Sequence, residues 1–170
     1  RALGKTAHVL PNTIHPSISS RVRNADRADR DGVVIGYFSG TKTHEHDFLF
    51  CADALHDVLT ERTEARLIIV GHLDLPAKFA GLGDRITRLP LMSHDDMLDV
   101  LADIDVNLAP LEAGSDFTNC KSELKIYEAA AFSIPTIASP TRPFSAIISH
   151  GRNGWLADTQ AAWREALLSA

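Results

Sequence analysis

Three residues whose spacing suits phosphate chemistry stand just before a buried apolar stretch. Ser122, Lys125 and Glu128 recur every three residues, as neighbours on one side of a helix do. We predict a helix that begins near Lys121 or Ser122, with the Ser122 hydroxyl as its cap. The first turn of such a helix offers unpaired backbone N–H groups and the positive end of the helix dipole, which suit a phosphate.

Glu128 adds a second function to the same helix. Helical side chains tilt toward the helix N-terminus, so its carboxylate leans toward the phosphate site. An ionised carboxylate only accepts hydrogen bonds, and its two oxygens suit a vicinal diol such as a ribose. Phosphate and diol together outline a nucleoside diphosphate. An ordinary alternative stays open, in which Glu128 is a solvated residue paired with Lys125 or Lys121.

The loop Ser39–Thr43 is a second place where a phosphate could bind. Gly40 allows the backbone to approach a ligand, and Lys42 could neutralise a phosphate. A plain turn between a strand and a helix explains the loop equally well. The chain contains neither GxxxxGK[ST] nor GxGxxG, so it supports neither a P-loop nor a dinucleotide fingerprint.

The eight histidines do not form a recognisable metal or catalytic motif. His44 and His46 lie two residues apart, which places them on different faces of a helix, and no cysteine or second histidine pair completes a site. The other six, His94 among them, are scattered. There is no G-x-S-x-G elbow, and one sequence does not identify a Ser–His–Asp or Cys–His set. We therefore expect no bound metal or cofactor and assign no catalytic residue.

Apolar runs alternate with helix-like segments along the chain, which predicts an α/β fold with a doubly wound parallel sheet. We predict strands at 33–38, 65–71, 85–89, 105–110 and 136–139, the third of them near an edge, and a short strand within 151–157. We predict helices within 46–59, 93–101, 142–149 and 159–169, and a short helix or irregular loop at 76–82. Ligands of such sheets bind beyond the carboxyl ends of the strands.

Composition places the protein among ordinary globular domains. The chain has 170 residues, 45% of them hydrophobic, and a net charge of -5, so no general attraction to nucleic acid is expected. Two cysteines do not make a disulfide framework, and we expect a cytoplasmic protein. No signal peptide or apolar run long enough for a membrane helix is visible. The chain starts at Arg1 without Met, and we expect a fragment of a longer protein.

Over residues 33–170 the sequence resembles the C-terminal domain of group 1 (family 4) glycosyltransferases. The resemblance rests on Gly36–Thr41, Leu67–Gly71, Arg88–Leu91, Asp105–Leu111 and, most specifically, Lys121–Ser139. It implies the C-terminal, Rossmann-like half of a two-domain GT-B fold. Residues 1–31 would then be an interdomain segment with a short strand at Ala7–Leu10, and residues 32–170 the donor-binding domain.

The resemblance also implies positions for a nucleotide. Glu128 matches the second acid of the family's E-x7-E motif, which holds the ribose hydroxyls. The residues matching loops around the phosphates are Gly40, Thr41 and Lys42, together with Ser122, Glu123 and Leu124 at the start of the helix. The residues matching loops that frame the base are Gly71 and the stretch from Leu89 to Leu91.

One position departs from the family pattern. Cys120 stands where the first acid of the motif is expected, near the donor sugar, so the sugar contact is unassigned; Glu123 or Asp116 could reach the spot. Of the family's basic pair on the phosphates only Lys42 is visible. Lys125 matches a lysine of a branch with a Lys-x-x-Glu core.

The resemblance implies a transferase that moves a sugar, with retention of configuration, from a nucleoside-diphosphate sugar to an acceptor. The acceptor (a glycan, a lipid-linked sugar or a small molecule) would be held by an N-terminal domain absent from this chain, so the fragment alone should be inactive. Membrane contact of the whole protein is left open. Two alternatives are a nucleotide-sugar epimerase of the same architecture and a non-catalytic interaction module.

Overall fold

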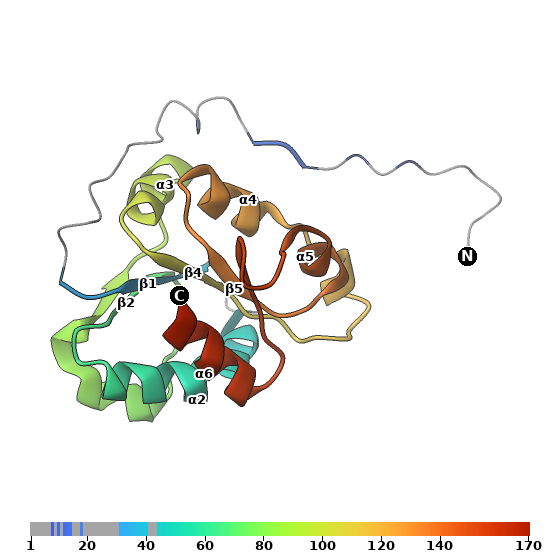
Figure 1. Cartoon of the computed structure of the whole chain (residues 1–170). Helices are drawn as coiled ribbons and strands as arrows, with labels where there is room; N and C mark the ends of the chain where they lie inside the picture. Colours follow the sequence, from blue (N-terminus) through green and yellow to red (C-terminus); the bar gives the residue numbers. More distant parts are fainter. Residues whose placement is uncertain (1–7, 9, 11, 15–17, 19–30, 41–43) are drawn as a thin grey trace.

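A six-stranded, wholly parallel sheet forms the centre of the molecule (Figure 1). The structure is a computed structural model that describes residues 31–40 and 44–170, together with residues 8, 10, 12–14 and 18. The strands lie in the order β3-β2-β1-β4-β5-β6. Their bounds are β1 (Val34–Ser39), β2 (Arg66–Gly71), β3 (Ile86–Leu89), β4 (Val106–Ala109), β5 (Thr136–Ala138) and β6 (Gly154–Leu156).

Helices cover both faces of this sheet. One layer contains α2 (His44–Glu61), α6 (Gln160–Ser169) and the 3-10 segment η2 (Ala77–Arg85). The opposite layer contains α3 (His94–Ala102), α4 (Leu124–Ala131) and α5 (Arg142–Ile147), and a short 3-10 turn, η3 (Thr118–Cys120), precedes α4. The predicted doubly wound α/β sheet is therefore confirmed.

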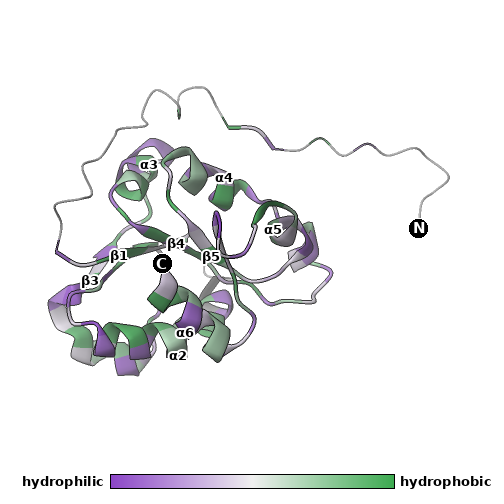
Figure 2. Cartoon of the chain, viewed as in Figure 1, coloured by the Kyte–Doolittle hydropathy of each residue, from purple (hydrophilic) through white to green (hydrophobic). Residues whose placement is uncertain are grey.

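The strands are buried because their apolar side chains alternate between the two faces. In β1, Ile35 and Tyr37 join the core under α2 and α6, whereas Phe38 joins the core under α3 and α4. In β2, Ile69 and Val70 divide between the faces in the same way. Figure 2 shows hydrophobic central strands and polar residues on the outer sides of the helices.

The layer formed by α2 and α6 is packed tightly. Trp163 of α6 is fully buried in the main core cluster. Gln160 joins the two helices, because its Oε1 accepts a hydrogen bond from the backbone N–H of Ala54 at 2.8 Å. At the surface, Arg164 Nη2 and Glu61 Oε2 form an exposed ion pair at 2.5 Å.

The chain reverses its winding direction between β1 and β4. From β1 it adds strands outward to β3, which lies at the edge as predicted, and then returns through α3 to β4 on the other side of β1. In sheets of this kind the ligand site lies at this switch point, beyond the carboxyl ends of the two central strands. We therefore expect a ligand site near Phe38–Gly40 and the loop after Ala109.

Two local predictions need correction, and a third is narrowed to one of its alternatives. The short helix or irregular loop expected at 76–82 is a short helix, the 3-10 segment η2, which begins at Ala77. The helix expected to begin at Lys121 or Ser122 begins at Leu124, because Lys121 is extended after the η3 turn. Of the strand expected at Ala7–Leu10, only His8 and Leu10 are described, and neither belongs to a strand.

Candidate functional site

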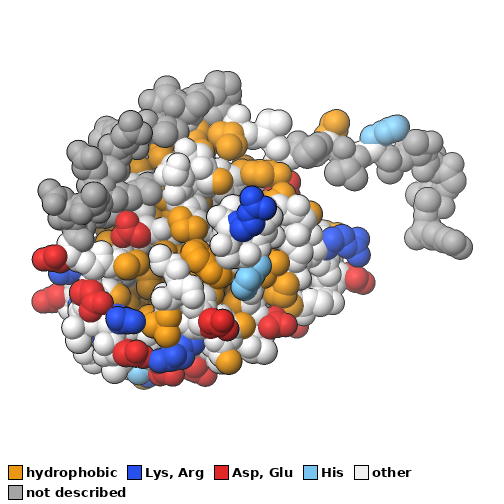
Figure 3. Space-filling view, viewed as in Figure 1, with side chains coloured by type: hydrophobic (Ala, Val, Ile, Leu, Met, Phe, Trp, Pro, Cys, Tyr) orange, Lys and Arg blue, Asp and Glu red, His pale blue; other side chains and the backbone are white. Residues whose placement is uncertain are grey.

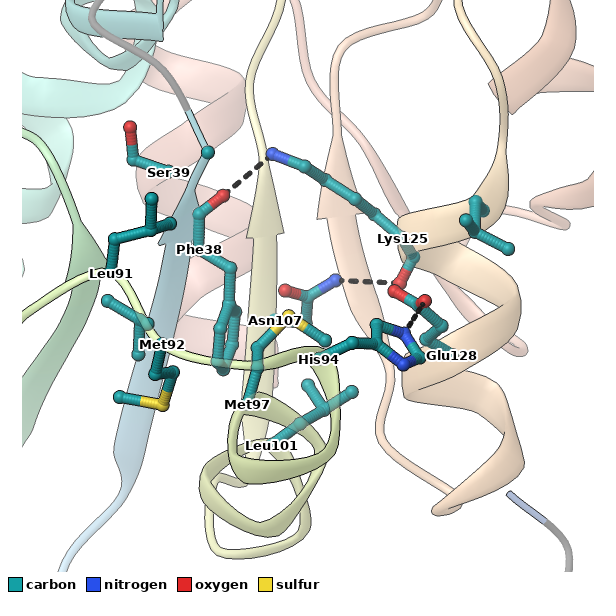
Figure 4. A pocket seen from close by; sticks show the side chains of 13 residues that line it. Phe38, Ser39, Leu91, Met92, His94, Met97, Leu101, Asn107, Lys125 and Glu128 are labelled. Atoms are coloured by element: carbon teal, nitrogen blue, oxygen red, sulfur yellow. Dashed lines mark hydrogen bonds and ion pairs between the residues drawn. The ribbon is translucent and has the colours of Figure 1, made fainter. Parts of the chain in front are cut away.

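A cavity of about 340 Å³ opens at the switch point, between α3 and α4 (Figure 4). We call it the first cavity. Its lining is mostly apolar, and the polar groups come from the end of β1, from β4, and from α3 and α4. The lining residues are Phe38, Ser39, Gly40, Val70, Leu91, Met92, His94, Met97, Leu101, Asn107, Leu124, Lys125 and Glu128.

Glu128 supplies a buried acceptor to this cavity. It lies in the second turn of α4 and is only 7% exposed. One carboxylate oxygen, Oε1, lies 2.7 Å from Nε2 of His94, which comes from α3 (Figure 4). The alternative of a solvated glutamate paired with a lysine is therefore wrong: the side chain is buried, and its partner is a histidine.

Lys125 crosses from α4 to the end of β1. Its Nζ donates a hydrogen bond to the carbonyl oxygen of Phe38 at 2.8 Å and lies 5.7 Å from the centre of the Tyr37 ring. Burial lowers the pKa of Lys125 to about 8, and nearby Lys121 adds to this shift, whereas Asp47 opposes it. A buried ammonium with one carbonyl partner is an incompletely compensated charge, which an anion would stabilise.

Asn107 holds the first turn of α4 in place. Its side-chain amide donates to the backbone oxygen of Lys125 at 3.4 Å and to Oγ1 of Thr136 at 3.1 Å. Asn107 lies in β4 between Val106 and Leu108, which point into the main core on the other face of the sheet. The polar side chain therefore fixes where Lys125 and Glu128 sit relative to the strands.

A second cavity, of about 260 Å³, lies beside the first. Its lining residues are Ala109, Pro110, Leu111, Lys121, Ser122, Leu124, Lys125 and Phe144. Leu124 and Lys125 line both cavities and so form the wall between them. Lys121 adds a further cation there, and its Nζ lies 3.0 Å from Oδ2 of the buried Asp47.

The start of α4 differs from the predicted cap. The residue at the N-cap position is Glu123, whose side chain makes no capping hydrogen bond. Ser122 acts one residue earlier, where its Oγ accepts a hydrogen bond from the backbone N–H of Leu124 at 3.1 Å. This two-residue reach is a local serine turn. The same Oγ accepts a hydrogen bond from Nδ2 of Asn12 at 2.8 Å.

The structure brings together only part of the predicted site. Gly40, Leu91, Leu124 and Glu128 line the first cavity, and Ser122 and Leu124 line the second. Thr41 and Lys42 lie outside the described residues.

The other predicted positions line neither cavity; they are Gly71, Leu89 and Glu123. For Gly71 the structure gives a packing reason. Its φ is +93°, and a Cβ there would lie 1.8 Å from the carbonyl oxygen of Ser39.

The residue that sequence reasoning missed is His94. It belongs to the six histidines in which the sequence shows no pattern, yet it lies in the first cavity and contacts Glu128. One signal in the sequence is its place directly after Ser93, the N-cap of α3, at the carboxyl-end edge of the sheet. What was missing was its partner, which is 34 positions away in the sequence.

The position of the missing first acid is occupied by an exposed thiol. Cys120 ends η3 and is exposed, whereas Cys51 is buried in α2. Glu123 and Asp116 line neither cavity.

In the described part of the chain, no three His, Cys, Asp or Glu side chains are grouped to hold a metal ion. That same part contains no helix long and apolar enough to cross a membrane.

The face of the molecule shown in Figure 3 carries both acidic and basic side chains, with hydrophobic side chains between them. Lys125 lines both cavities, and Lys121 lines the second.

Solved structures with the same fold include several sugar-handling enzymes. Anabaena HepE, solved with UDP and glucose, is 19% identical, with a TM-score of 0.61; the match covers 92% of this chain and 42% of that one. WaaG, a glycosyltransferase involved in lipopolysaccharide biosynthesis, is 16% identical, with a TM-score of 0.67 and coverages of 94% and 46%. A putative UDP-N-acetylglucosamine 2-epimerase from Listeria monocytogenes is 16% identical, with a TM-score of 0.56 and coverages of 94% and 40%.

The chain thus spans less than half the length of these three structures. Comparison with curated proteins gives no significant match. The family model described as "Glycosyl transferases group 1" matches residues 32–170, which is most of the chain and includes the six strands of the sheet and both cavities. The protein therefore belongs to the group 1 glycosyltransferases.

Proposed function

We propose that this domain binds the nucleoside-diphosphate part of an activated sugar and is the donor half of a retaining glycosyltransferase. The observation that carries the proposal is the buried carboxylate of Glu128 beside an apolar cavity at the switch point of the sheet. A buried acceptor of this kind is costly unless a ligand or a fixed partner uses it. A ribose diol is such a ligand, because its two hydroxyls donate to one carboxylate.

The nucleoside would occupy the first cavity. Its volume of about 340 Å³ lies within the range of small-molecule sites. Phe38, Leu91 and Met92 offer apolar surface to the faces of a base, and Glu128 offers its oxygens to the sugar next to it. Polar recognition at one end and apolar contact at the other is the usual composition of a nucleotide pocket.

The diphosphate would then lie on the wall between the two cavities. Lys125 is placed there with its ammonium toward the end of β1, and Lys121 lines the second cavity. The first turn of α4 presents the positive end of its dipole to the same place. These cations and dipoles would stabilise the charge that grows on the departing nucleoside diphosphate. Lys42, from the loop after β1, would add to them.

The complete transferase would need a second domain. The matched structures are more than twice as long as this chain, and their additional length is available for an acceptor site. We propose that an N-terminal domain holds the acceptor across a cleft from the two cavities. The 170-residue chain alone should then bind the nucleotide and transfer nothing.

Calorimetric titration with UDP, GDP and ADP tests the binding proposal. We expect one of the three to bind, and Glu128→Gln to weaken its binding by ~1–3 kcal/mol through the loss of charge-assisted hydrogen bonds. Glu61→Gln, on the exposed surface of α2, is the matched control and should bind as the wild type does. Unchanged affinity in a folded Glu128→Gln protein would remove the ribose role.

A second candidate is a non-catalytic domain of the same family, and Cys120 is the residue that favours it, because the family places an acid there. This candidate would be supported if the full-length protein binds a nucleoside diphosphate but transfers no sugar, and if Cys120→Glu does not restore transfer.

An epimerase of the same architecture would convert one nucleotide sugar into another without an acceptor, and product analysis separates it from a transferase.

A further inference from the structure

We infer that His94 is the positioning residue of the nucleotide site, which orients the carboxylate of Glu128 for the ribose. The inference rests on the proposed function and extends it to a residue that does not itself contact the nucleotide phosphates. It begins from one contact across the first cavity, between Nε2 of His94 and Oε1 of Glu128 at 2.7 Å.

The backbone of His94 is fixed at the start of α3. Ser93, the residue before it, accepts a hydrogen bond from the backbone N–H of Asp96 at 3.2 Å, and its own hydroxyl donates to the carboxylate of Asp96 at 2.6 Å. A helix start closed in this way leaves little freedom to its first residue. The imidazole therefore extends from a rigid position toward α4 (Figure 4).

Glu128 depends on this one donor. Among the described residues, the only hydrogen bond to its carboxylate comes from His94. Lys125, which the sequence offers as a partner, donates instead to the carbonyl oxygen of Phe38. A carboxylate that is 7% exposed beside methionine and leucine side chains needs a hydrogen-bond donor to stay in one orientation.

The contact leaves one oxygen for a ligand. With Oε1 held by His94, Oε2 accepts no hydrogen bond from the described residues. Nε2–H donates in the neutral Nε2-protonated imidazole and in the imidazolium alike, so the contact does not require a charged histidine. One ribose hydroxyl can donate to Oε2 and the other to the second lone pair of Oε1. A carboxylate that is already held in one orientation loses less entropy when the diol binds. His94 therefore contributes to affinity through Glu128.

The test measures discrimination between a ribonucleotide and its 2′-deoxy form. The probes are UDP and 2′-deoxy-UDP, or the corresponding GDP or ADP pair if that nucleotide binds best. The quantity compared is the ratio of the dissociation constants of 2′-deoxy-UDP and UDP. Replacing a residue that only supports the fold would weaken the binding of both probes equally and leave this ratio unchanged. Replacing a residue that orients the ribose acceptor would change the ratio. We expect His94→Leu to weaken UDP binding about tenfold, as for the loss of one charge-assisted hydrogen bond, and to bring the ratio close to that of Glu128→Gln.

Three further variants make the test specific. His94→Gln puts a side-chain amide donor near the place of Nε2 and should restore much of the ratio. The double variant His94→Leu/Glu128→Gln should lose no more than Glu128→Gln alone, because both changes act on one interaction. His56→Leu, a partly buried histidine that packs on Phe79 in the opposite layer, is the matched control and should leave the ratio unchanged.

The side chain of His94 is 54% exposed, so its replacement should leave the protein folded, and thermal unfolding checks this. A wild-type ratio in His94→Leu, with a collapsed ratio in Glu128→Gln, would overturn the inference and leave the proposed function standing. Absence of binding by every nucleoside diphosphate in the wild type would overturn both.

Discussion

The two helical layers of this domain face the same sheet but differ in what they bury. The layer of α2 and α6 covers the main apolar core, centred on the fully buried Trp163. The layer of α3 and α4 buries Glu128 and the side chain of Asn107, and it contains the first cavity. The sheet contributes Asn107 of β4 to this difference, and the helix α4 contributes Glu128.

This difference separates stability from binding. Apolar burial is the main favourable contribution to folding, and the main core under α2 and α6 contains more buried apolar side chains than the core under α3 and α4. A buried carboxylate contributes little or unfavourably to folding, so its presence indicates a use other than stability. We therefore expect substitutions in the first layer to change the free energy of unfolding, and substitutions in the second to change ligand affinity.

The largest expected effect is on stability. Trp163→Ala should lower the free energy of unfolding by ~3–5 kcal/mol, because it leaves a large cavity in the main core. Urea denaturation followed by circular dichroism measures this, and nucleotide affinity of the protein that stays folded should not change. Trp155→Ala is the matched control, because Trp155 is only partly buried and should cost less. Equal losses for the two tryptophans would contradict the contrast between the layers.

The next largest effect is a loss of nucleotide affinity that is not accompanied by a loss of stability. Glu128→Met should reduce nucleoside-diphosphate affinity by ~1–3 kcal/mol, since the ribose acceptor is gone. Its thermal midpoint should be unchanged or higher, because a buried charge is replaced by an apolar side chain of similar length and His94, the former partner, is half exposed. Calorimetry and thermal unfolding of one sample measure both quantities. A strongly destabilised protein with normal affinity would reverse our assignment of the second layer.

A smaller effect depends on pH through Lys125. Its pKa of about 8 lies below the ordinary value of 10.5, so the ammonium is lost as pH rises through about 8 in the free protein. A diphosphate favours the ammonium and raises the pKa again, so binding takes up a proton near pH 8 and weakens above it. At pH 9 only about a tenth of a lysine with this pKa stays charged, so affinity should fall up to about tenfold from pH 7 to pH 9.

Titration in two buffers of different ionisation enthalpy measures this proton uptake directly. Lys125→Arg keeps the charge throughout the range, and we expect it to abolish both the uptake and the loss of affinity above pH 8. Equal pH dependence in the wild type and in Lys125→Arg would show that another group titrates.

The smallest effect lies on the outer surface of the first layer. Arg164 and Glu61 form an ion pair in which both side chains are about half exposed. Arg164→Ala should therefore lower the free energy of unfolding by less than about 1 kcal/mol, and by less still in high salt. Denaturation at two salt concentrations tests this. A larger loss would mean that the layer depends on charge as well as on apolar packing.

The strands and their parallel, doubly wound arrangement could be predicted from the sequence because the central strands are near-continuous apolar runs that alternate with helical segments. Val34–Ser39 and Arg66–Gly71 lie within one residue of their predicted bounds. Even the edge position of β3 followed from its polar Thr87 and Arg88, since an edge strand has one neighbour fewer and more exposure. Periodicity is a local property, and a single sequence contains it in full.

The site was less predictable because it depends on contacts between distant segments. Glu128 was recognised by its place in the helix, but its partner His94 could not be, since nothing in the spacing joins α3 to α4. The start of α4 was placed too early because a serine caps helices and also forms short turns, and Ser122 does the latter. The contact of Lys125 with the end of β1 likewise required the sheet order.

The two thiols differ in exposure, so a fluorescent dye can be attached to one of them selectively. Burial raises the pKa of the Cys51 thiol far above its ordinary value, so maleimide reagents at neutral pH should leave it untouched. Cys120 is exposed, and it directly precedes Lys121, a lining residue of the second cavity. A single dye attached there would report occupancy of the lysine-lined wall through its emission, without any engineered cysteine.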